Sequence, residues 1–150
     1  YIERKDKINR YFYPIKICLI SQGLTNTHGF VISLHNELFG FGSNRGGQIG
    51  LQMDNDIARE LVVDTVKYEI SPRMISFVFD SNVKQISCGI NFSLFLTVLG
   101  NVYGCGYNED NQLTSEYDSN DGISKIINTG NIIKIGCCDE SSFMLGNDNI

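Results

Sequence analysis

Side chains that could catalyse a reaction are few in this sequence, and they form no catalytic pattern. His28 and His35 are its only histidines. No nucleophile elbow, Walker-type phosphate loop or HExxH zinc pattern is present. Segment 40–47 (GFGSNRGG) resembles a phosphate loop only in its glycines, because no helix is predicted to begin after it. We therefore expect no catalytic residue, and our interpretation is that the chain is not an enzyme.

Metal-ligating side chains also lack the spacing of a known site. The sequence has 5 cysteines with no CxxC pair, which argues against a zinc site and against a disulfide framework. The acidic run 118–121 (DSND) lacks the loop length and the terminal glutamate of an EF-hand. We expect no metal and no cofactor. Free cysteines in apolar strands favour an intracellular location, either cytoplasmic or nuclear.

The charge balance narrows the class of partner. The net charge is −5, which disfavours contact with DNA because nucleic-acid binding depends on Lys and Arg neutralising phosphates. No apolar run approaches the roughly 20 residues that span a bilayer, so we expect no membrane contact. Acidic residues concentrate in the predicted loops. They indicate a solvated rim that would steer a basic protein surface.

The elements that would position these side chains are repeated along the chain. Segment 20–51 (ISQGLTNTHGFVISLHNELFGFGSNRGGQIGL) matches segment 86–114 (ISCGINFSLFLTVLGNVYGCGYNEDNQLT), and a third copy begins at Ile132. In the third copy, Phe143 and Leu145 match Leu94 and Leu96. The residues that define the motif are Gly23, Gly42, Gln48, Gly50, Gly89, Gly100, Gly104, Gly106, Asn108 and Gln112.

Each copy has the pattern of a β-hairpin. Apolar residues alternate in 93–98, which is the period of a strand with two different faces. Gly100-Asn101 predicts a tight two-residue turn before the next strand. Glycines at alternate positions in 38–42 leave one face bare, so that another strand or backbone can approach closely. A single hairpin cannot bury its own apolar face, and the copies must therefore stack around an axis.

The motif resembles the repeat of the regulator-of-chromosome-condensation (RCC1) family, most closely in 86–113. Segments 46–50 (GGQIG) and 71–75 (SPRMI) also resemble the closing and the Pro-containing lead of that repeat. The resemblance implies an all-β fold of antiparallel blades from a seven-bladed type of β-propeller. We place repeats at about 15–51, 72–114 and 123–150. Two to three repeats make a partial ring, so we expect this chain to belong to a longer protein; otherwise its open edges must pair with another chain.

The repeats leave a surplus at 52–70 (QMDNDIARELVVDTVKYEI), in which 58–66 suits a short helix or an added strand. Loops of a rigid scaffold often carry its contacts, although surface insertions are also tolerated without a function. If the segment is a contact loop, its charged residues would meet the partner: Asp54, Asp56, Arg59 and Glu60.

The family resemblance gives His28 a structural role. His28 precedes a predicted strand, where we expect a hydrogen bond to a neighbouring turn, and His35 falls in a solvated turn.

The favoured function is a protein–protein interaction scaffold. Two alternatives remain open. One is guanine nucleotide exchange on a small GTPase of the Ran type, and the other is partner binding within a larger ubiquitin ligase.

Overall fold

The chain forms antiparallel β-strands in a computed structural model that describes residues 15–20, 27–51, 68–114, 122–127 and 130–147. The predicted all-β class is therefore confirmed. The strands are β1 Ile15–Ile20, β2 His28–Ser33, β3 Leu38–Ser43, β4 Tyr68–Met74, β5 Val83–Cys88, β6 Phe92–Thr97, β7 Val102–Gly106, β8 Ser124–Ile127, β9 Ile132–Cys138 and β10 Ser141–Gly146.

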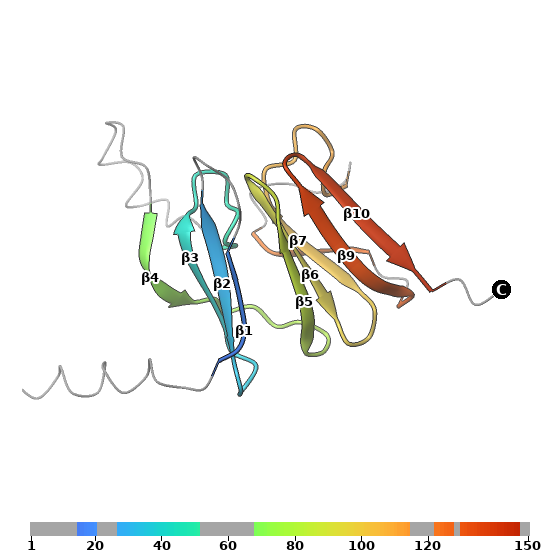
Figure 1. Cartoon of the computed structure of the whole chain (residues 1–150), viewed down its shortest axis with the longest axis horizontal. Helices are drawn as coiled ribbons and strands as arrows, with labels where there is room; N and C mark the ends of the chain where they lie inside the picture. The colour runs from blue at the N-terminus through green and yellow to red at the C-terminus, as the bar shows by residue number, and fades with distance from the viewer. Residues whose placement is uncertain (1–14, 21–26, 52–67, 115–121, 128–129, 148–150) are drawn as a thin grey trace, which may run out of the picture.

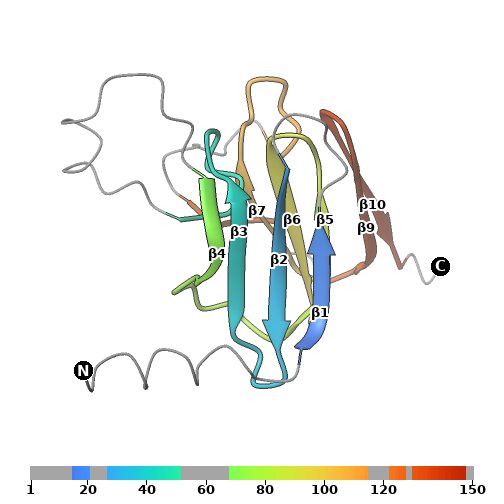
Figure 2. The same cartoon turned by 60° about the vertical axis from the view of Figure 1, so that its left-hand side comes forward.

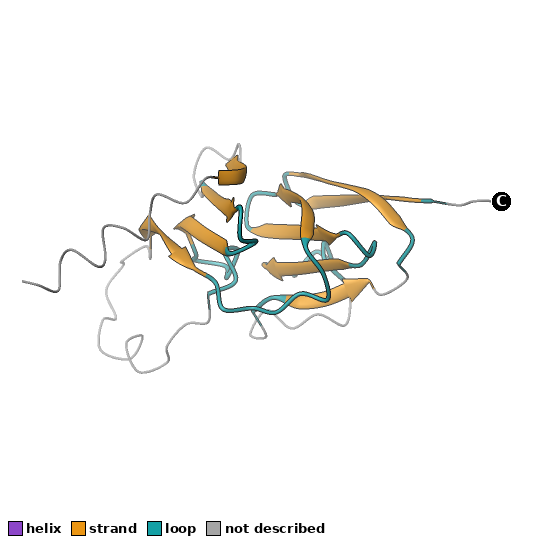
Figure 3. Cartoon of the chain, turned by 90° about the horizontal axis from the view of Figure 1, so that it is seen from below, coloured by secondary structure: helices purple, strands orange, loops and turns teal. Residues whose placement is uncertain are grey.

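The strands make three sheets in chain order. The first sheet is β1-β2-β3-β4, the second is β5-β6-β7-β8, and the third is β9-β10. All neighbouring strands are antiparallel. Figure 1 shows the sheets side by side with the second in the middle, and Figure 3 shows them as successive layers from below. Each sheet therefore has a neighbour to cover at least one of its faces.

Strand β6 shows why the layers must stack, because every one of its side chains is buried. Phe92, Leu94 and Leu96 pack in a cluster with side chains of the third sheet. Phe95 points the other way, into a cluster shared with the first sheet. A strand with apolar groups on both faces is stable only when both faces are covered.

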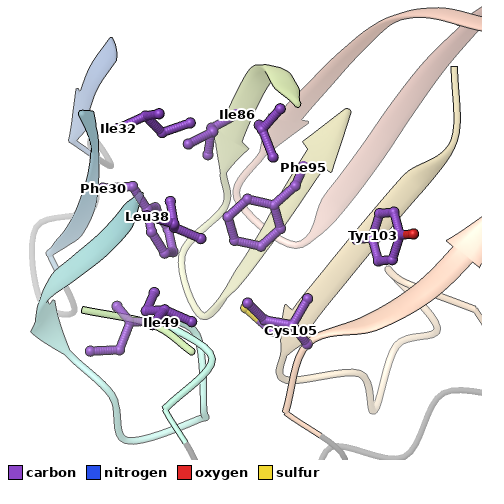
Figure 4. Close-up of a cluster of buried hydrophobic side chains, with 11 residues drawn as sticks. Phe30, Ile32, Leu38, Ile49, Ile86, Phe95, Tyr103 and Cys105 are labelled. Atoms are coloured by element: carbon purple, nitrogen blue, oxygen red, sulfur yellow. The ribbon is translucent and has the colours of Figure 1, made fainter. Parts of the chain in front are cut away.

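Two apolar cores result, one on each side of the second sheet. The core between the first and second sheets holds Phe30 and Phe95, whose ring centroids lie 5.0 Å apart in an edge-to-face arrangement. Figure 4 shows these rings with side chains from both sheets around them. The members of this core are Phe30, Ile32, Leu38, Ile49, Ile75, Val83, Ile86, Phe95, Tyr103, Cys105 and Ile123.

The alternate glycines allow the close approach that their spacing predicts. A β-carbon on Gly40 would lie 3.0 Å from Ile75 Cδ1 and 3.1 Å from Ile49 Cβ. A β-carbon on Gly104 would lie 2.7 Å from Leu113 Cδ2. Ile49 and Leu113 occupy matching positions in the two copies, so the bare strand face is filled by the apolar residue that follows each glutamine.

The hairpin turn at 98–101 is longer than Gly100-Asn101 predicts. Thr97 N–H donates to the Asn101 carbonyl at 3.0 Å, which leaves three residues in the loop. Gly100 has φ +81° and Asn36, at the matching position of the first sheet, has φ +62°. Such three-residue loops end in a residue of left-handed conformation, which glycine and asparagine tolerate best. The two-residue turn is wrong, although the turn lies where it was predicted.

Strand β4 begins at Tyr68 and pairs with β3, so it overlaps the last residues of the segment assigned as an insertion. Pro72 fits into this strand because β4 is an edge of its sheet and the register shifts between Gly40 and Gly42. Residues 52–67, including 58–66, lie outside the described residues.

Replacing Gly106 with Ala tests the close approach of backbones. Gly106 has φ +110°, and its β-carbon would overlap the Asn91 carbonyl oxygen. We expect Gly106→Ala to lower the free energy of unfolding by at least about 2 kcal/mol, measured by urea denaturation. Gly136→Ala is the control, because a β-carbon there meets nothing within 4 Å, and it should change stability by less than about 0.5 kcal/mol. Equal effects of the two variants would contradict this account.

Candidate functional site

A buried polar bridge joins the first sheet to the second. Ser93 Oγ donates to the Gln48 carbonyl at 2.8 Å. His28 Nε2 lies 2.8 Å from the same hydroxyl. The hydroxyl has one proton and gives it to Gln48, so His28 Nε2 is the donor in the second bond. His28 thus bonds to a strand of the next sheet, and its predicted hydrogen bond to a neighbouring turn stays a prediction.

The asparagine of each copy holds the loop that follows the third strand of its sheet. Asn44 Oδ1 accepts from Ile49 N–H at 3.1 Å, and its Nδ2 donates to a carbonyl further along the loop at 3.2 Å. Asn108 repeats both bonds, accepting from Leu113 N–H at 2.8 Å and donating to a later carbonyl at 2.5 Å. These side chains replace backbone pairing that an irregular loop cannot make, which explains why both copies contain Asn.

The glutamine of each copy closes the same loop from inside. Gln48 Oε1 accepts from Gly46 N–H at 2.8 Å, and Gln112 Oε1 accepts from Asp110 N–H at 3.1 Å. Both glutamines are buried. The Gln48 carbonyl also accepts from Cys105 Sγ at 3.3 Å, so this loop is attached to the second sheet. The motif side chains thus hold their own loops, and the Gln48 carbonyl joins one of these loops to the second sheet.

A link to the third sheet comes from residues that the motif did not include. Gln85 Nε2 donates to the Ile135 carbonyl at 2.7 Å, and Ile135 N–H donates to Gln85 Oε1 at 3.0 Å. Nearby, Cys137 N–H donates to Ser87 Oγ at 2.8 Å. The side-chain amide of Gln85 thus makes two hydrogen bonds to the backbone of β9, as the backbone of a neighbouring strand would. A single polar residue in an alternating strand gives no sequence signal for such a contact.

The other predicted motif residues fall at turns and contacts. Gly50 has φ +68°, and its β-carbon would overlap Ile123, which belongs to the core between the first and second sheets. A β-carbon on Gly89 would overlap the Phe92 ring. Gly42 has φ +93°, and its β-carbon would overlap the Thr27 carbonyl oxygen. Five predicted residues lie outside the described part of the chain: Gly23, Asp54, Asp56, Arg59 and Glu60.

The described side chains offer little chemistry. Among them, no group of three or more His, Cys, Asp or Glu residues could hold a metal ion, and no buried side-chain polar atom lacks a hydrogen-bond partner.

Burial raises the pKa of the Cys88 thiol to about 12 and that of Cys137 to about 11. Both thiols are therefore protonated at neutral pH and are poor nucleophiles. No helix in the described part has the length and apolar character to cross a membrane.

The sheet stack has two ends, at which different loops and turns connect the strands (Figure 2). The loop end, formed by residues 44–51, 107–114 and 139–140, carries an acidic group of Glu109, Asp110, Asp139 and Glu140. Tyr107 Oη donates to Glu109 Oε2 at 2.6 Å, and this bond raises the Tyr107 pKa to about 12. The tyrosine therefore stays neutral and adds no charge to the acidic group.

The opposite end, which we call the hairpin end, comprises residues 34–37, 75–82 and 98–101. Here Asp80 Oδ2 accepts from Lys125 Nζ at 2.9 Å and from Asn101 Nδ2 at 2.6 Å. Burial alone would raise the pKa of Asp80, but these bonds outweigh it and hold the pKa well below its usual range. Lys125 also lies 5.3 Å from the centroid of the Tyr103 ring. This cluster attaches the 75–82 segment to strands β7 and β8.

Family models and curated proteins match this chain through its repeats. The model described as the regulator of chromosome condensation (RCC1) repeat matches residues 35–96, and a second model of the same description matches 83–112. An RCC1 domain-containing protein of Dictyostelium discoideum is 30% identical over 130 residues, which are 75% of this chain and 24% of that protein. A human RCC1-like G exchanging factor-like protein is 32% identical over 123 residues, 73% of this chain and 25% of that protein. The chain spans about a quarter of these relatives.

Solved structures of the same kind share the arrangement of sheets. Human WBSCR16 superposes with a TM-score of 0.62 at 28% identity, over 81% of this chain and 29% of that one. Prp20p of Saccharomyces cerevisiae superposes with a TM-score of 0.65 at 20% identity, over 87% of this chain and 32% of that one. The antiparallel sheets thus match part of a β-propeller of this type.

Replacing Asp80 with Asn tests the charge cluster. A carboxylate whose pKa is lowered in the folded state stabilises the fold above its unfolded pKa of about 3.9, and this contribution is lost as pH falls toward the folded value. We expect Asp80→Asn to lose about 1 kcal/mol or less at pH 7, because the pair is partly exposed. As the pH falls below about 4, the difference from the wild type should shrink progressively, as followed by urea denaturation at several pH values.

Lys84→Gln is the control for that experiment, because it removes one charge from the same end without touching the cluster. Lys125→Gln should reproduce part of the loss at pH 7. A difference between the wild type and Asp80→Asn that stays constant from pH 7 to pH 2 would contradict the assignment.

Proposed function

The chain belongs to the RCC1 repeat family, and we propose that it works as a protein–protein interaction scaffold and not as an enzyme. The observation that carries this proposal is the use made of its buried polar groups. His28, Ser93 and Gln48 bond to one another across two sheets, and Gln85 bonds to the third. These groups maintain the stack, so the side chains left for function are those displayed at its ends.

A scaffold needs rigid elements and a varied surface. The stack has two apolar cores, and its loops are held by side-chain hydrogen bonds in both copies. Such preorganised loops lose little conformational freedom when a partner binds. The ends of the stack also differ in charge and in apolar exposure, which gives a partner a basis for discrimination. These features support binding without requiring a reaction.

The segment 52–70 is the contact element that we propose. It connects β3 to the edge strand β4, which pairs with β3 and is anchored from Tyr68 onward. An insertion between two paired strands can vary without disturbing the sheet. Its charged residues Asp54, Asp56, Arg59 and Glu60 would supply polar contacts.

Guanine nucleotide exchange on a small GTPase is the second candidate. It is favoured by the 32% identity to proteins named RCC1-like G exchanging factor-like protein, in mouse and human. A partner-binding role in a ubiquitin ligase has narrower support, since the human probable E3 ubiquitin-protein ligase HERC3 is 43% identical over only 49 residues, 5% of its length. Both activities would belong to a whole protein of which this chain matches a part.

Two measurements separate these functions. Release of a fluorescent guanine nucleotide from Ran-type GTPases should not accelerate when the full protein is added at micromolar concentration. Affinity capture with quantitative mass spectrometry should enrich a partner, and the enrichment should fall at least about fivefold when 53–66 is replaced by a Gly/Ser linker. The replacement leaves Tyr68 and all of β4 in place.

A matched linker at 116–120 is the control, because it changes another segment that connects two paired strands. Stimulated nucleotide release would overturn the scaffold proposal in favour of exchange. Partner enrichment that survives the 53–66 replacement would overturn the contact role of that segment.

A further inference from the structure

An apolar strip crosses the hairpin end, and its centre is an extended segment that we call the strap, residues 75–82. Phe77 and Phe79 turn inward, with ring centroids 4.9 Å apart, and pack at 5.6 and 5.0 Å from the Tyr103 ring. Val78, between them, is 91% exposed. The two anchored rings hold this valine outward, so its exposure is a built feature of the strap and not the result of a loose loop.

The tip of the β6–β7 hairpin continues the strip on the second sheet. Val98 and Leu99 are 59% and 57% exposed. Val98 N–H donates to the Asn82 carbonyl at 2.8 Å, and Leu99 N–H donates to Ser81 Oγ at 3.2 Å. These bonds fix the tip against the end of the strap, so the apolar side chains of the two segments belong to one surface.

On the first sheet, Leu34 and Met74 extend the strip in the other direction. Both are more than half exposed. Ile75 N–H donates to the Leu38 carbonyl at 2.8 Å, which fixes the start of the strap beside the β2–β3 hairpin that carries Leu34. Apolar side chains that occur singly on a surface need no explanation, but a strip that joins two sheets at one end marks an interaction site.

The charges beside the strip differ from those at the loop end. Glu37 and Asp80 lie at the hairpin end, but Lys125 neutralises Asp80. Lys84, exposed at the start of β5, adds positive charge there. The loop end has one basic side chain, Arg45, and four acidic ones. The loop end therefore repels an acidic ligand, whereas Lys84 attracts one at the hairpin end.

We propose that the hairpin end binds a partner-protein segment that combines apolar side chains with acidic ones, the apolar groups lying on Val78, Val98 and Leu99 and an acidic group near Lys84. This inference rests on the scaffold function and names the partner chemistry of one surface. It is separate from the contact role of 52–70. Because the strip is fixed before binding, the affinity comes from apolar burial with little ordering cost.

The probe is a fluorescein-labelled dodecapeptide with leucine at every third position and glutamate and serine between, measured by fluorescence anisotropy with the full chain. We expect saturable binding that weakens as salt increases. Val78→Asp and Lys84→Glu should each weaken binding about tenfold or more. Arg45→Glu, a matched charge reversal at the loop end, should change it less than about twofold. Thermal unfolding of each variant establishes that it is folded.

Three further measurements test other occupants of this surface. A peptide with lysine in place of glutamate tests a basic partner, and vesicles of one-third phosphatidylserine in phosphatidylcholine test a membrane. Sedimentation of the chain alone tests binding of a second copy. Equal or tighter binding of the lysine peptide, vesicle binding lost in Val78→Asp, or self-association lost in Val78→Asp would each overturn the proposal. So would the absence of saturable binding of the acidic peptide up to 1 mM, roughly the limit of specific recognition.

Failure of this inference can be distinguished from failure of the scaffold function. If the peptide does not bind but cellular partners are enriched through another surface, only the proposed binding at the hairpin end is contradicted. If the peptide binds as expected but no partner is enriched, binding at the hairpin end is supported and the scaffold function is contradicted.

Discussion

Each sheet of this protein depends on a neighbour, because a sheet of two to four strands with apolar side chains on both faces cannot cover them itself. Strand β6 shows the constraint most clearly, since all its side chains are buried between two other sheets. Face-to-face burial of this kind supplies most of the stabilisation of a stacked β-architecture. The glycines at alternate strand positions make room for the apolar residues of the loops that follow, and the loop of Gln48 is bonded to the second sheet.

The hydrogen bonds between sheets define how the layers meet. Apolar burial is not directional, so it does not fix one relative position of two sheets. The bridge through Ser93 and the amide of Gln85 do fix it, because a buried polar group is costly unless its partner is at hydrogen-bond distance. A stack fixed in this way presents its two ends with constant geometry, and the proposed binding surfaces depend on that constancy.

Local features could be predicted from the sequence, and contacts between sheets could not. The alternation in β6 and the recurring glycines predicted an all-β fold and its family, and both are confirmed. The bond from His28 to Ser93 joins residues 65 apart in the chain, and its geometry depends on how the sheets are tilted. The charge cluster at Asp80 and the exposed Val78 gave no repeat signal, because they lie outside the two segments that match each other, 20–51 and 86–114. The repeat boundaries and the contact role of 52–70 stay predictions.

The mutual dependence of the sheets is tested most directly by hydrogen exchange in Phe95→Ala. This change removes a buried ring of the second sheet from the core that it shares with the first, which should cost about 3 kcal/mol or more. The account predicts that the protection of amides in β2 and in β6 falls by a similar factor, because the two sheets unfold together. Amides of β2 that keep their wild-type protection while those of β6 lose it would contradict the account.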